Sequence, residues 1–474
     1  MWPNLAIRIN QRDLDRNKLT HIYPETICAP NLHAVHLSSN NIRFVAEKSF
    51  QKLSKTKTLF LSNNLLSHLP TELFKKMATT STLRLQTNKL SFIDTGAFSG
   101  MNKLQLLQLS GNPIRNFYEF QLPAVAFMDF LGLSRSYPLK LHGNGNLAKA
   151  KKNSVVIKVL DLTNNFLSKI NQLDFGDCRT LNVSSNALYN IHLDALEPFA
   201  KLQSLMLQYN NLQKLDFIRP LSQLIVLSLT SNSIKAINVK DFAKLASLKE
   251  LYLQHNQISD VNAVLKGLKN IRIIYLSDNT IETLKNKSFT LYQNLRILDL
   301  SNNAVTLSDQ EDLGLTFLEE LNLAGNEITY LNCSGLPPVL RSLTLANNNI
   351  VKIDPNCDRL FYQVTKIDMS YTNLIANGID LQKDFLDKLN LVNDLKLAGN
   401  NWPGILEGMA AIINLKLDIS DNPVILDTFI RDLYDRVGQF LIGMCFYYNL
   451  DITVYNTVTS MNGISSLAPK YQIT

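Results

Sequence analysis

Apolar and polar positions alternate in short stretches that recur along the chain about every 24 residues. In each stretch a polar residue separates two apolar residues, and an Asn follows three places after the second one, as in Leu251, Leu253 and Asn256. A further apolar residue stands two places after the Asn, and a Phe often stands ten places after it, as at Phe74 and Phe98. This alternation predicts a short strand with one buried face in every unit.

The Asn recurs at intervals of 21 to 24 residues apart from two longer gaps, at Asn17, Asn40, Asn64, Asn88, Asn112, Asn165, Asn186, Asn210, Asn232, Asn256, Asn279, Asn303, Asn326, Asn348, Asn400 and Asn422. Each gap holds one degenerate unit, with Ser136 and Thr372 in the Asn position, which gives 18 units. A single unit cannot bury its apolar face, so the units must stack. We therefore expect an α/β solenoid: a horseshoe of about 18 repeats with a parallel β-sheet on its concave face and a ladder of buried Asn side chains.

The pattern Leu-x-x-Leu-x-Leu-x-x-Asn-x-Leu at this spacing is that of leucine-rich repeats. With its Phe column, the sequence resembles extracellular animal leucine-rich repeat proteins over about residues 9–424. Residues 331–337 (Leu-Asn-Cys-Ser-Gly-Leu-Pro) are similar to insect members, including mosquito leucine-rich immune proteins. Toll-type ectodomains and chaoptin-like adhesion proteins share the repeat. The resemblance implies an extracellular location and, for the immune proteins, partner chains and complement-like factors. The cysteines and coiled-coil tail that usually follow the repeats in that immune family are not visible here.

Three segments follow from this reading: a solenoid over residues 1–424, a C-terminal capping segment over 425–449 and a tail over 450–474. The first unit begins within ten residues of Met1, so we expect the N-terminal cap of the solenoid to be missing. Residues 422–433 resemble the Asn-Pro start of a cysteine-rich cap, and the apolar spacing after them predicts a helix. The start of the chain has no seven-residue apolar run and no small-residue cleavage site, so it does not read as a signal peptide, and the longest apolar stretches, of about nine residues, are too short to span a membrane.

Composition and motifs argue against two classes of function, nucleic-acid binding and enzymatic activity. The 47 Lys and Arg against 40 Asp and Glu give a net charge of +7 that is spread over 474 residues, so the sequence shows no basic stripe for nucleic acid. It has no Gly-x-Ser-x-Gly, His-Glu-x-x-His or Cys-x-x-Cys motif. We therefore expect no enzymatic activity, no cofactor and no catalytic or metal-ligating residues.

Two covalent features bear on the compartment. Cys333 and Cys357 follow their ladder Asn residues in adjacent units, which favours a disulfide between them, with buried free thiols as the alternative. Asn286 begins the sequon Asn-Lys-Ser and falls on the convex side just before Phe289, where a glycan is tolerated. The sequon at Asn182 falls on the concave strand instead, where a glycan is less readily accommodated.

The concave positions beside the strand leucines are small or polar in most units, but four consecutive units differ. Adjacent strands lie about 4.8 Å apart, so Tyr252 and Tyr275 should neighbour each other and His255 should lie beside Asp278. Exposed aromatics with small residues around them are typical of a binding anchor; the alternative is that the tyrosines merely cover the sheet. The candidate partner-binding residues are Met206, Tyr209, Glu250, Tyr252, His255, Tyr275 and Asp278.

These observations favour an extracellular protein-recognition module that binds a protein ligand or partner chain on its concave face, and the resemblance adds insect innate immunity as a setting. The alternative is the ectodomain of a cell-surface receptor or adhesion protein of the Toll or chaoptin kind. Neither hypothesis involves nucleic acid, and a dimer is left open.

Overall fold

The computed structural model divides into two compact units: residues 1–234 with 240–248, and residues 235–239 with 249–474. The residues that the structure describes are 11–24, 26–27, 30–114, 125, 127–136, 156–170, 178–265, 267–285, 287–307, 313–379, 388–389, 391–402, 416–423 and 451–453.

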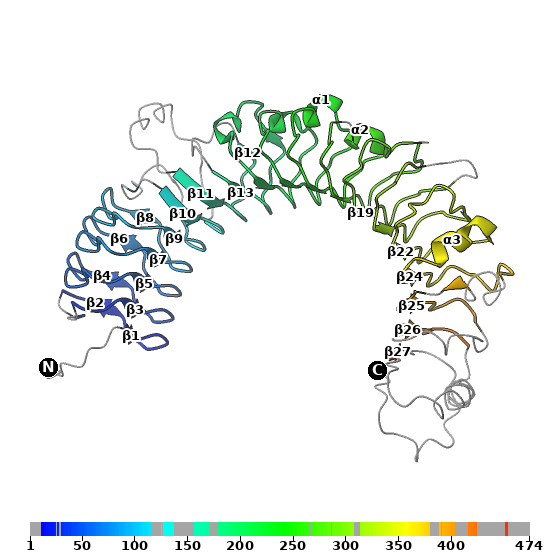
Figure 1. Ribbon diagram of the computed structural model, residues 1–474. Helices are drawn as coiled ribbons and strands as arrows, with labels where there is room; N and C mark the ends of the chain where they lie inside the picture. The colour runs from blue at the N-terminus through cyan, green and yellow to red at the C-terminus, as the bar shows by residue number, and fades with distance from the viewer. Residues whose placement is uncertain are drawn as a thin grey trace, which may run out of the picture. The chain divides into compact units, whose positions relative to one another are not determined.

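In the first unit, parallel strands lie side by side in chain order (Figure 1). From β3 onward, the central residue of each three-residue strand is buried and aligns with its counterpart in the next strand, as Leu59 aligns with Val35 and Leu83, whereas Arg12 at the centre of β1 is exposed. The described strands of this sheet are β1 Gln11–Asp13, β3 Ala34–His36, β5 Thr58–Phe60, β7 Thr82–Arg84, β9 Leu106–Gln108, β10 Phe127–Gly132, β11 Val156–Asp161, β13 Thr180–Asn182, β15 Ser204–Met206 and β16 Val226–Ser228.

The second unit repeats the arrangement, and Leu251, Ile274 and Leu298 align in successive strands. Its described strands are β17 Glu250–Tyr252, β18 Ile273–Tyr275, β19 Ile297–Asp299, β20 Glu320–Asn322, β22 Ser342–Thr344, β24 Lys366–Asp368, β25 Asp394–Lys396, β26 Lys416–Asp418 and β27 Asp451–Thr453. In both units, the residues on either side of the buried position form an exposed surface, which we call the strand face.

Shorter elements follow the main strands. Four two-stranded parallel pairs join neighbouring repeats: β2 His21–Ile22 with β4 Phe44–Val45, β6 His68–Leu69 with β8 Phe92–Ile93, β12 Lys169–Ile170 with β14 Asn190–Ile191, and β21 Tyr330–Leu331 with β23 Lys352–Ile353. The described helices are single turns: α1 Val239–Phe242, α2 Val261–Leu265, α3 Asp358–Phe361, and the 3₁₀ turns η3 Glu197–Phe199, η4 Asp216–Ile218 and η5 Pro355–Cys357.

The core of each unit consists of the repeated leucines, isoleucines and phenylalanines. Phe50, Phe74 and Phe98 are fully buried, and their rings stack in order with centroids 5.9 and 6.0 Å apart. The predicted Phe column is therefore confirmed in this part of the chain. It fills the space behind the sheet that the leucines leave open, because close packing leaves few voids in a protein interior.

The Asn ladder is also confirmed. Asn279 donates from Nδ2 to the carbonyls of Leu253 and Leu276, both at 3.0 Å, and its Oδ1 accepts the amide of Ile258 at 2.9 Å. One side chain thus satisfies backbone groups of its own turn and of the turn before it, as buried polar groups require. Together with the sheet and the aligned core, these bonds establish the predicted leucine-rich repeat solenoid.

The two degenerate positions behave differently from each other. Thr372 keeps part of the ladder, because its Oγ1 donates to the Met369 carbonyl at 2.6 Å. Ser136 is fully buried, and its amide donates to Oδ1 of Asn165 at 2.7 Å. Its Oγ, however, has no hydrogen-bond partner in the described part of the chain. A hydroxyl on one carbon is too short to span two turns as the amide does.

The sheet extends further than the pattern predicts. Strand β27 pairs in parallel with β26, although its residues belong to the segment expected to be a tail. The expected capping segment 425–449 and most of the tail lie outside the described residues. In the parts of the chain that the structure describes, no helix has the length and apolar character needed to cross a membrane.

Candidate functional site

Two tyrosines meet on the strand face of the second unit. Because side chains alternate along a strand, the buried Leu251 and Ile274 turn Tyr252 and Tyr275 outward. The two tyrosines occupy paired positions of β17 and β18, and their rings stack with centroids 5.3 Å apart at an interplanar angle of 12°. Both side chains are half-buried. The predicted neighbourhood of these two residues is therefore confirmed.

Two isoleucines extend this apolar surface. Ile273 pairs in register with Ile297 of β19, and both are half-buried on the strand face. The same row of the sheet continues to Glu250 on one side and to Glu320 on the other. The result is an apolar centre of two isoleucines and two tyrosines with a carboxylate at each end.

A third carboxylate lies beside the tyrosines, because Asp299 pairs with Tyr275 in the sheet register. Tyr252 donates from its hydroxyl to Oε2 of Glu250 at 3.1 Å. Burial first, and then the Glu250 carboxylate, raise the pKa of Tyr252 to about 12. Burial and the charges of Asp299, Glu320 and Glu250 also raise the pKa of Tyr275. Both phenols are therefore neutral hydrogen-bonding groups at physiological pH. We call Glu250, Tyr252, Ile273, Tyr275, Ile297, Asp299 and Glu320 the acidic-aromatic patch.

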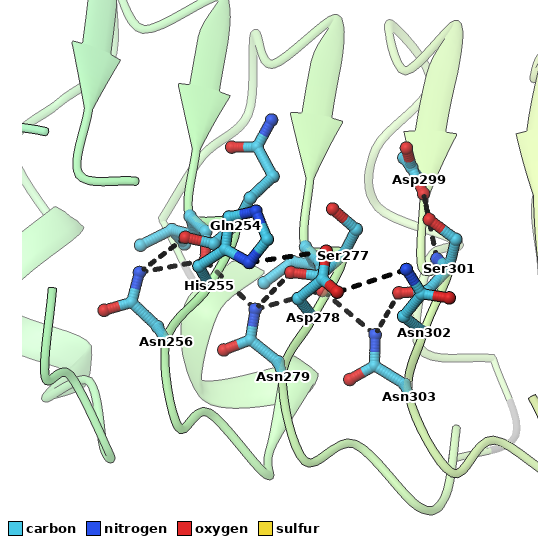
Figure 2. A network of polar contacts seen from close by, with 12 residues as sticks. Gln254, His255, Asn256, Ser277, Asp278, Asn279, Asp299, Ser301, Asn302 and Asn303 are labelled. Atoms are coloured by element: carbon cyan, nitrogen blue, oxygen red, sulfur yellow. Dashed lines mark hydrogen bonds and ion pairs between the residues drawn. The ribbon is translucent and has the colours of Figure 1, made fainter. Parts of the chain in front are cut away.

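The turns after these strands carry a second polar row (Figure 2). Nδ1 of His255 lies 3.6 Å from Oδ2 of Asp278, as the repeat frame predicts, and Nδ2 of Asn302 donates to Oδ1 of the same carboxylate at 3.1 Å. His255, Asp278 and Asn302 all have positive φ angles, between 53° and 55°. This shared backbone conformation fixes the spacing of the row, which borders the acidic-aromatic patch.

The other two predicted residues lie in the first unit. Met206 pairs with Asn182 and Ser228 on neighbouring strands and is half-buried. Tyr209 occupies the turn that follows, with a φ of 59°, and is 59% exposed. The structure thus brings five of the seven predicted residues together within the second unit, and Met206 and Tyr209 form a separate pair in the first.

The last strands of the second unit carry charge of another kind. Lys366 pairs with Asp394, which pairs with Lys416, and in the second row Asp368 pairs with Lys396, which pairs with Asp418. Opposite charges therefore alternate in both directions of the sheet and compensate one another. A shallow depression of about 390 Å³ lies over this region between Tyr371 and Asp421, with small residues such as Ala398 at its floor.

Sequence reading missed Ile297, Asp299 and Glu320. Their signal was present, because they stand beside the strand leucines Leu298 and Leu321 in the same frame that identified Tyr252 and Tyr275. None of the three is aromatic, so an exposed aromatic side chain does not mark them in the sequence. Their role follows only from the register, which brings three carboxylates to the edge of one apolar surface.

The covalent predictions have separate outcomes. The structure joins Cys333 and Cys357 by a disulfide with an S–S distance of 2.02 Å. Cys178 in the first unit is a buried free thiol, and burial raises its pKa to about 12, so it is unreactive at neutral pH. The predicted glycosylation site Asn286 lies outside the described residues.

Within the described residues, one group of three has ligand atoms close enough together for a metal ion: Asp13, Asp15 and His36, within 4.8 Å of one another. The carboxylates there already have protein partners. Asp13 accepts the amide of Asp15, and Asp15 accepts the amide of Ser38. These turn contacts account for the positions of the two carboxylates.

Comparisons with known proteins agree with the repeat. Family descriptions of the leucine-rich repeat match residues 30–79, 57–114, 214–258 and 314–331, and one for two copies of the repeat matches 246–286. These matches and the fold support a leucine-rich repeat protein.

The curated relatives include podocan of Mus musculus, 28% identical over 281 residues that cover 56% of this chain and 44% of podocan. Lumican of Mus musculus is 28% identical over 292 residues, which cover 55% of this chain and 82% of lumican. An adenylate cyclase of Schizosaccharomyces pombe is 25% identical over 58% of this chain, but the match covers only 15% of the cyclase. The chain thus spans less than half the length of podocan and of the cyclase.

Two solved structures show the same fold. Toll, in its complex with Spatzle, aligns over 85% of this chain and 52% of its own, with a TM-score of 0.60 and 19% identity. A leucine-rich repeat protein of Leptospira interrogans aligns over 94% of this chain and 95% of its own, with a TM-score of 0.52 and 20% identity.

Proposed function

We propose that this chain is an extracellular protein-recognition module that binds a protein partner on the strand face of its second unit. The observation that carries the proposal is the stacked pair Tyr252 and Tyr275 beside Ile273 and Ile297. Aromatic side chains near the centre of an interface supply much of its binding energy, and polar groups around them exclude water. Hydrogen bonds and ion pairs border this apolar centre on the strand face.

The extracellular location is supported by the disulfide between Cys333 and Cys357, because disulfides persist in oxidising compartments. The same feature fits the alternative of a receptor or adhesion ectodomain, which would use the same strand face. An insect innate-immune role rests on the sequence resemblance. Toll was solved in complex with Spatzle, and its likeness to this chain supports the fold.

The test needs a partner and a matched pair of variants. An array of secreted proteins and ectodomains from the source organism is screened with the parent chain, and each hit is measured again with Tyr252→Ala/Tyr275→Ala. Replacement of both anchors should weaken binding by at least about 2 kcal/mol, or roughly 30-fold. The control is Tyr189→Ala/Tyr362→Ala, which removes two tyrosines that are 52% and 47% exposed away from the strand face.

The control should bind as the parent does. If a double variant with the circular dichroism of the parent keeps full affinity for the partner while lacking Tyr252 and Tyr275, the partner site lies elsewhere and the proposal is wrong.

A further inference from the structure

The charges on strands β17 to β20 all have one sign. Glu250, Asp299 and Glu320 are the ionisable residues of these strands other than the tyrosines, and Asp278 follows in the turn after β18. In β24 to β26, by contrast, every carboxylate on the strand face has a lysine as its in-register neighbour. The chain as a whole carries a net charge of +7. The negative charge of the acidic-aromatic patch is therefore local.

Nearby cations do not cancel this charge. Arg296 is turned away from the patch, because its Nη1 donates to the Gln293 carbonyl at 2.9 Å, its Nε lies 3.4 Å from Glu319, and its guanidinium lies 5.7 Å from the centre of the Phe317 ring. Lys249 and Arg272 directly precede β17 and β18 and are exposed to solvent.

Counted with the residue that precedes each strand, β17 to β20 and the Asp278 turn carry five carboxylates against three cations. An excess of negative charge therefore remains around the apolar centre.

We propose that the acidic-aromatic patch binds a positively charged segment of a partner protein, whose arginine or lysine side chains lie against Tyr252 and Tyr275 and pair with Glu250, Asp299 and Glu320. This inference rests on the proposed function and specifies the chemistry of the partner.

A cationic side chain is attracted to an aromatic ring and to a carboxylate by separate interactions, and a guanidinium can make both at once. Its apolar stem would cover Ile273 and Ile297, as long basic side chains cover apolar surface elsewhere. Burial is the first cause of the raised pKa of both tyrosines, and the neighbouring carboxylates add to it. A neutral apolar partner would leave the three carboxylates partly desolvated without a counter-charge, which is unfavourable.

The probe is a short fluorescein-labelled peptide of alternating serine and arginine, and its counterpart has citrulline in place of every arginine. Citrulline keeps the shape of the side chain and removes its charge. Binding to the parent chain is measured by fluorescence anisotropy at low and at high salt. The arginine peptide should bind at least about tenfold more tightly than the citrulline peptide, and salt should reduce the difference by screening.

The test variant is Glu250→Gln/Asp299→Asn/Glu320→Gln. Asp299→Asn preserves the local turn, because Asn182 at the equivalent place in β13 accepts the amide and hydroxyl of Ser184 just as Asp299 accepts those of Ser301. The control is Glu47→Gln/Glu282→Gln/Glu327→Gln, which changes the net charge equally at three exposed positions off the patch. The test variant should lose at least about tenfold in affinity for the arginine peptide, and the control less than twofold.

Equal binding of the two peptides, no measurable binding of either, or equal losses in the two triple variants would overturn the inference. If the triple variant does not fold, the single change Glu320→Gln at an exposed position replaces it and should cost at least about threefold. A different result would contradict the proposed function. That proposal is wrong if the screened partner binds the variant without Tyr252 and Tyr275 as tightly as it binds the parent, whether or not the peptides bind. If that partner needs the tyrosines but the arginine peptide does not bind, the proposed protein recognition is retained and the proposal of a positively charged partner segment is wrong.

Discussion

Asn64 satisfies backbone groups in two successive turns at once. Its Nδ2 donates to the Leu37 carbonyl at 2.9 Å and to the Leu61 carbonyl at 3.1 Å, and its Oδ1 accepts the amide of Ile42 at 3.0 Å. A shorter side chain cannot make this set of bonds, and the buried hydroxyl of Ser136 has no hydrogen-bond partner in the described part of the chain. The Asn is thus the residue that makes one repeat depend on the next.

Asn64→Ala should therefore destabilise the first unit by about 1–3 kcal/mol, because buried backbone groups lose their partners. The local measurement is hydrogen exchange at the amide of Ile42, which should become faster than in the parent. Ser67→Ala, three residues later at an exposed position, is the control and should leave this exchange unchanged. Unchanged exchange at Ile42 in the Asn64 variant would contradict the ladder geometry.

The phenol of Tyr252 responds to its burial and to the neighbouring Glu250 carboxylate. Its pKa is raised to about 12, by burial and then by Glu250, whereas in the unfolded chain it has its ordinary value of about 10. The folded protein thus holds this proton where the unfolded chain releases it, so the contribution of Tyr252 to stability falls as the pH rises from about 10 to about 12.

Glu250→Gln should lower the pKa of Tyr252 part of the way toward its ordinary value, because burial, the larger cause, remains. The measurement is a titration of the tyrosine Cζ resonance in the parent and the variant by nuclear magnetic resonance. Glu282→Gln, exposed and off the strand face, should leave the titration where it is. Coincident curves for all three proteins would show that Glu250 does not act on the phenol.

At the scale of elements, β21 and β23 are joined by more than their two-residue pairing. Tyr330 donates its hydroxyl to Asp354, the ammonium of Lys352 lies 5.0 Å from the centre of the Tyr330 ring, and the disulfide of Cys333 and Cys357 closes the same pair of repeats. Short pairs of this kind have few backbone bonds of their own, so the side chains and the disulfide hold them together.

Cys333→Ala/Cys357→Ala should destabilise this region by about 3 kcal/mol, the size expected for a disulfide that closes a loop of 24 residues. Hydrogen exchange at the amide of Asp354, which donates to the Leu331 carbonyl at 3.0 Å, is the local measurement. Cys178→Ala, at a buried free thiol in the first unit, serves as the control. If both variants exchange at the rate of the parent, the disulfide does not stabilise these strands.

The main strands could be predicted from sequence. Apolar residues alternate with polar ones along each strand and stand at a fixed distance from the ladder Asn, so only one alignment of neighbouring strands fits the pattern. Leu251 and Leu253 locate β17 on these grounds alone, and Tyr252 and Tyr275 follow as neighbours. The pair β21 and β23 could not be predicted, because two residues carry no periodicity. Strand β27 could not be predicted either, since no ladder Asn follows it in the sequence. The carboxylates of the patch required the register of four strands at once.

At the scale of the whole molecule, the repeat separates stability from recognition. The inward positions and the Asn ladder are nearly the same in every repeat, so they specify the fold and carry no information about a partner. The strand-face positions contribute little to the core, so their residue types differ from one repeat to the next. That freedom allows compensated charges on β24 to β26 and an acidic, aromatic surface on β17 to β20 within one unit.

The extracellular proposal makes a chemical prediction for the whole chain. Besides Asn286 and Asn182, a third sequon begins at Asn332, in Asn-Cys-Ser. Asn182 on the strand face accepts hydrogen bonds from the amide and hydroxyl of Ser184, and Asn332 is 8% exposed beside the disulfide. Both side chains are occupied or enclosed by the fold. The sequon that begins at Asn286, by contrast, has the exposed Lys287 as its middle residue.

When the chain is secreted from a eukaryotic cell behind an added signal peptide, Asn286 should therefore carry an N-glycan. Peptide mapping before and after glycosidase treatment measures the occupancy of all three sequons, and Ser288→Ala is the control, since it removes the sequon and keeps Asn286 itself. A folded, secreted chain with Asn286 bare and with a glycan on Asn182 instead would contradict the prediction. It would also remove the strand face of the first unit from consideration as a protein-binding surface, because a sugar on β13 would cover it there.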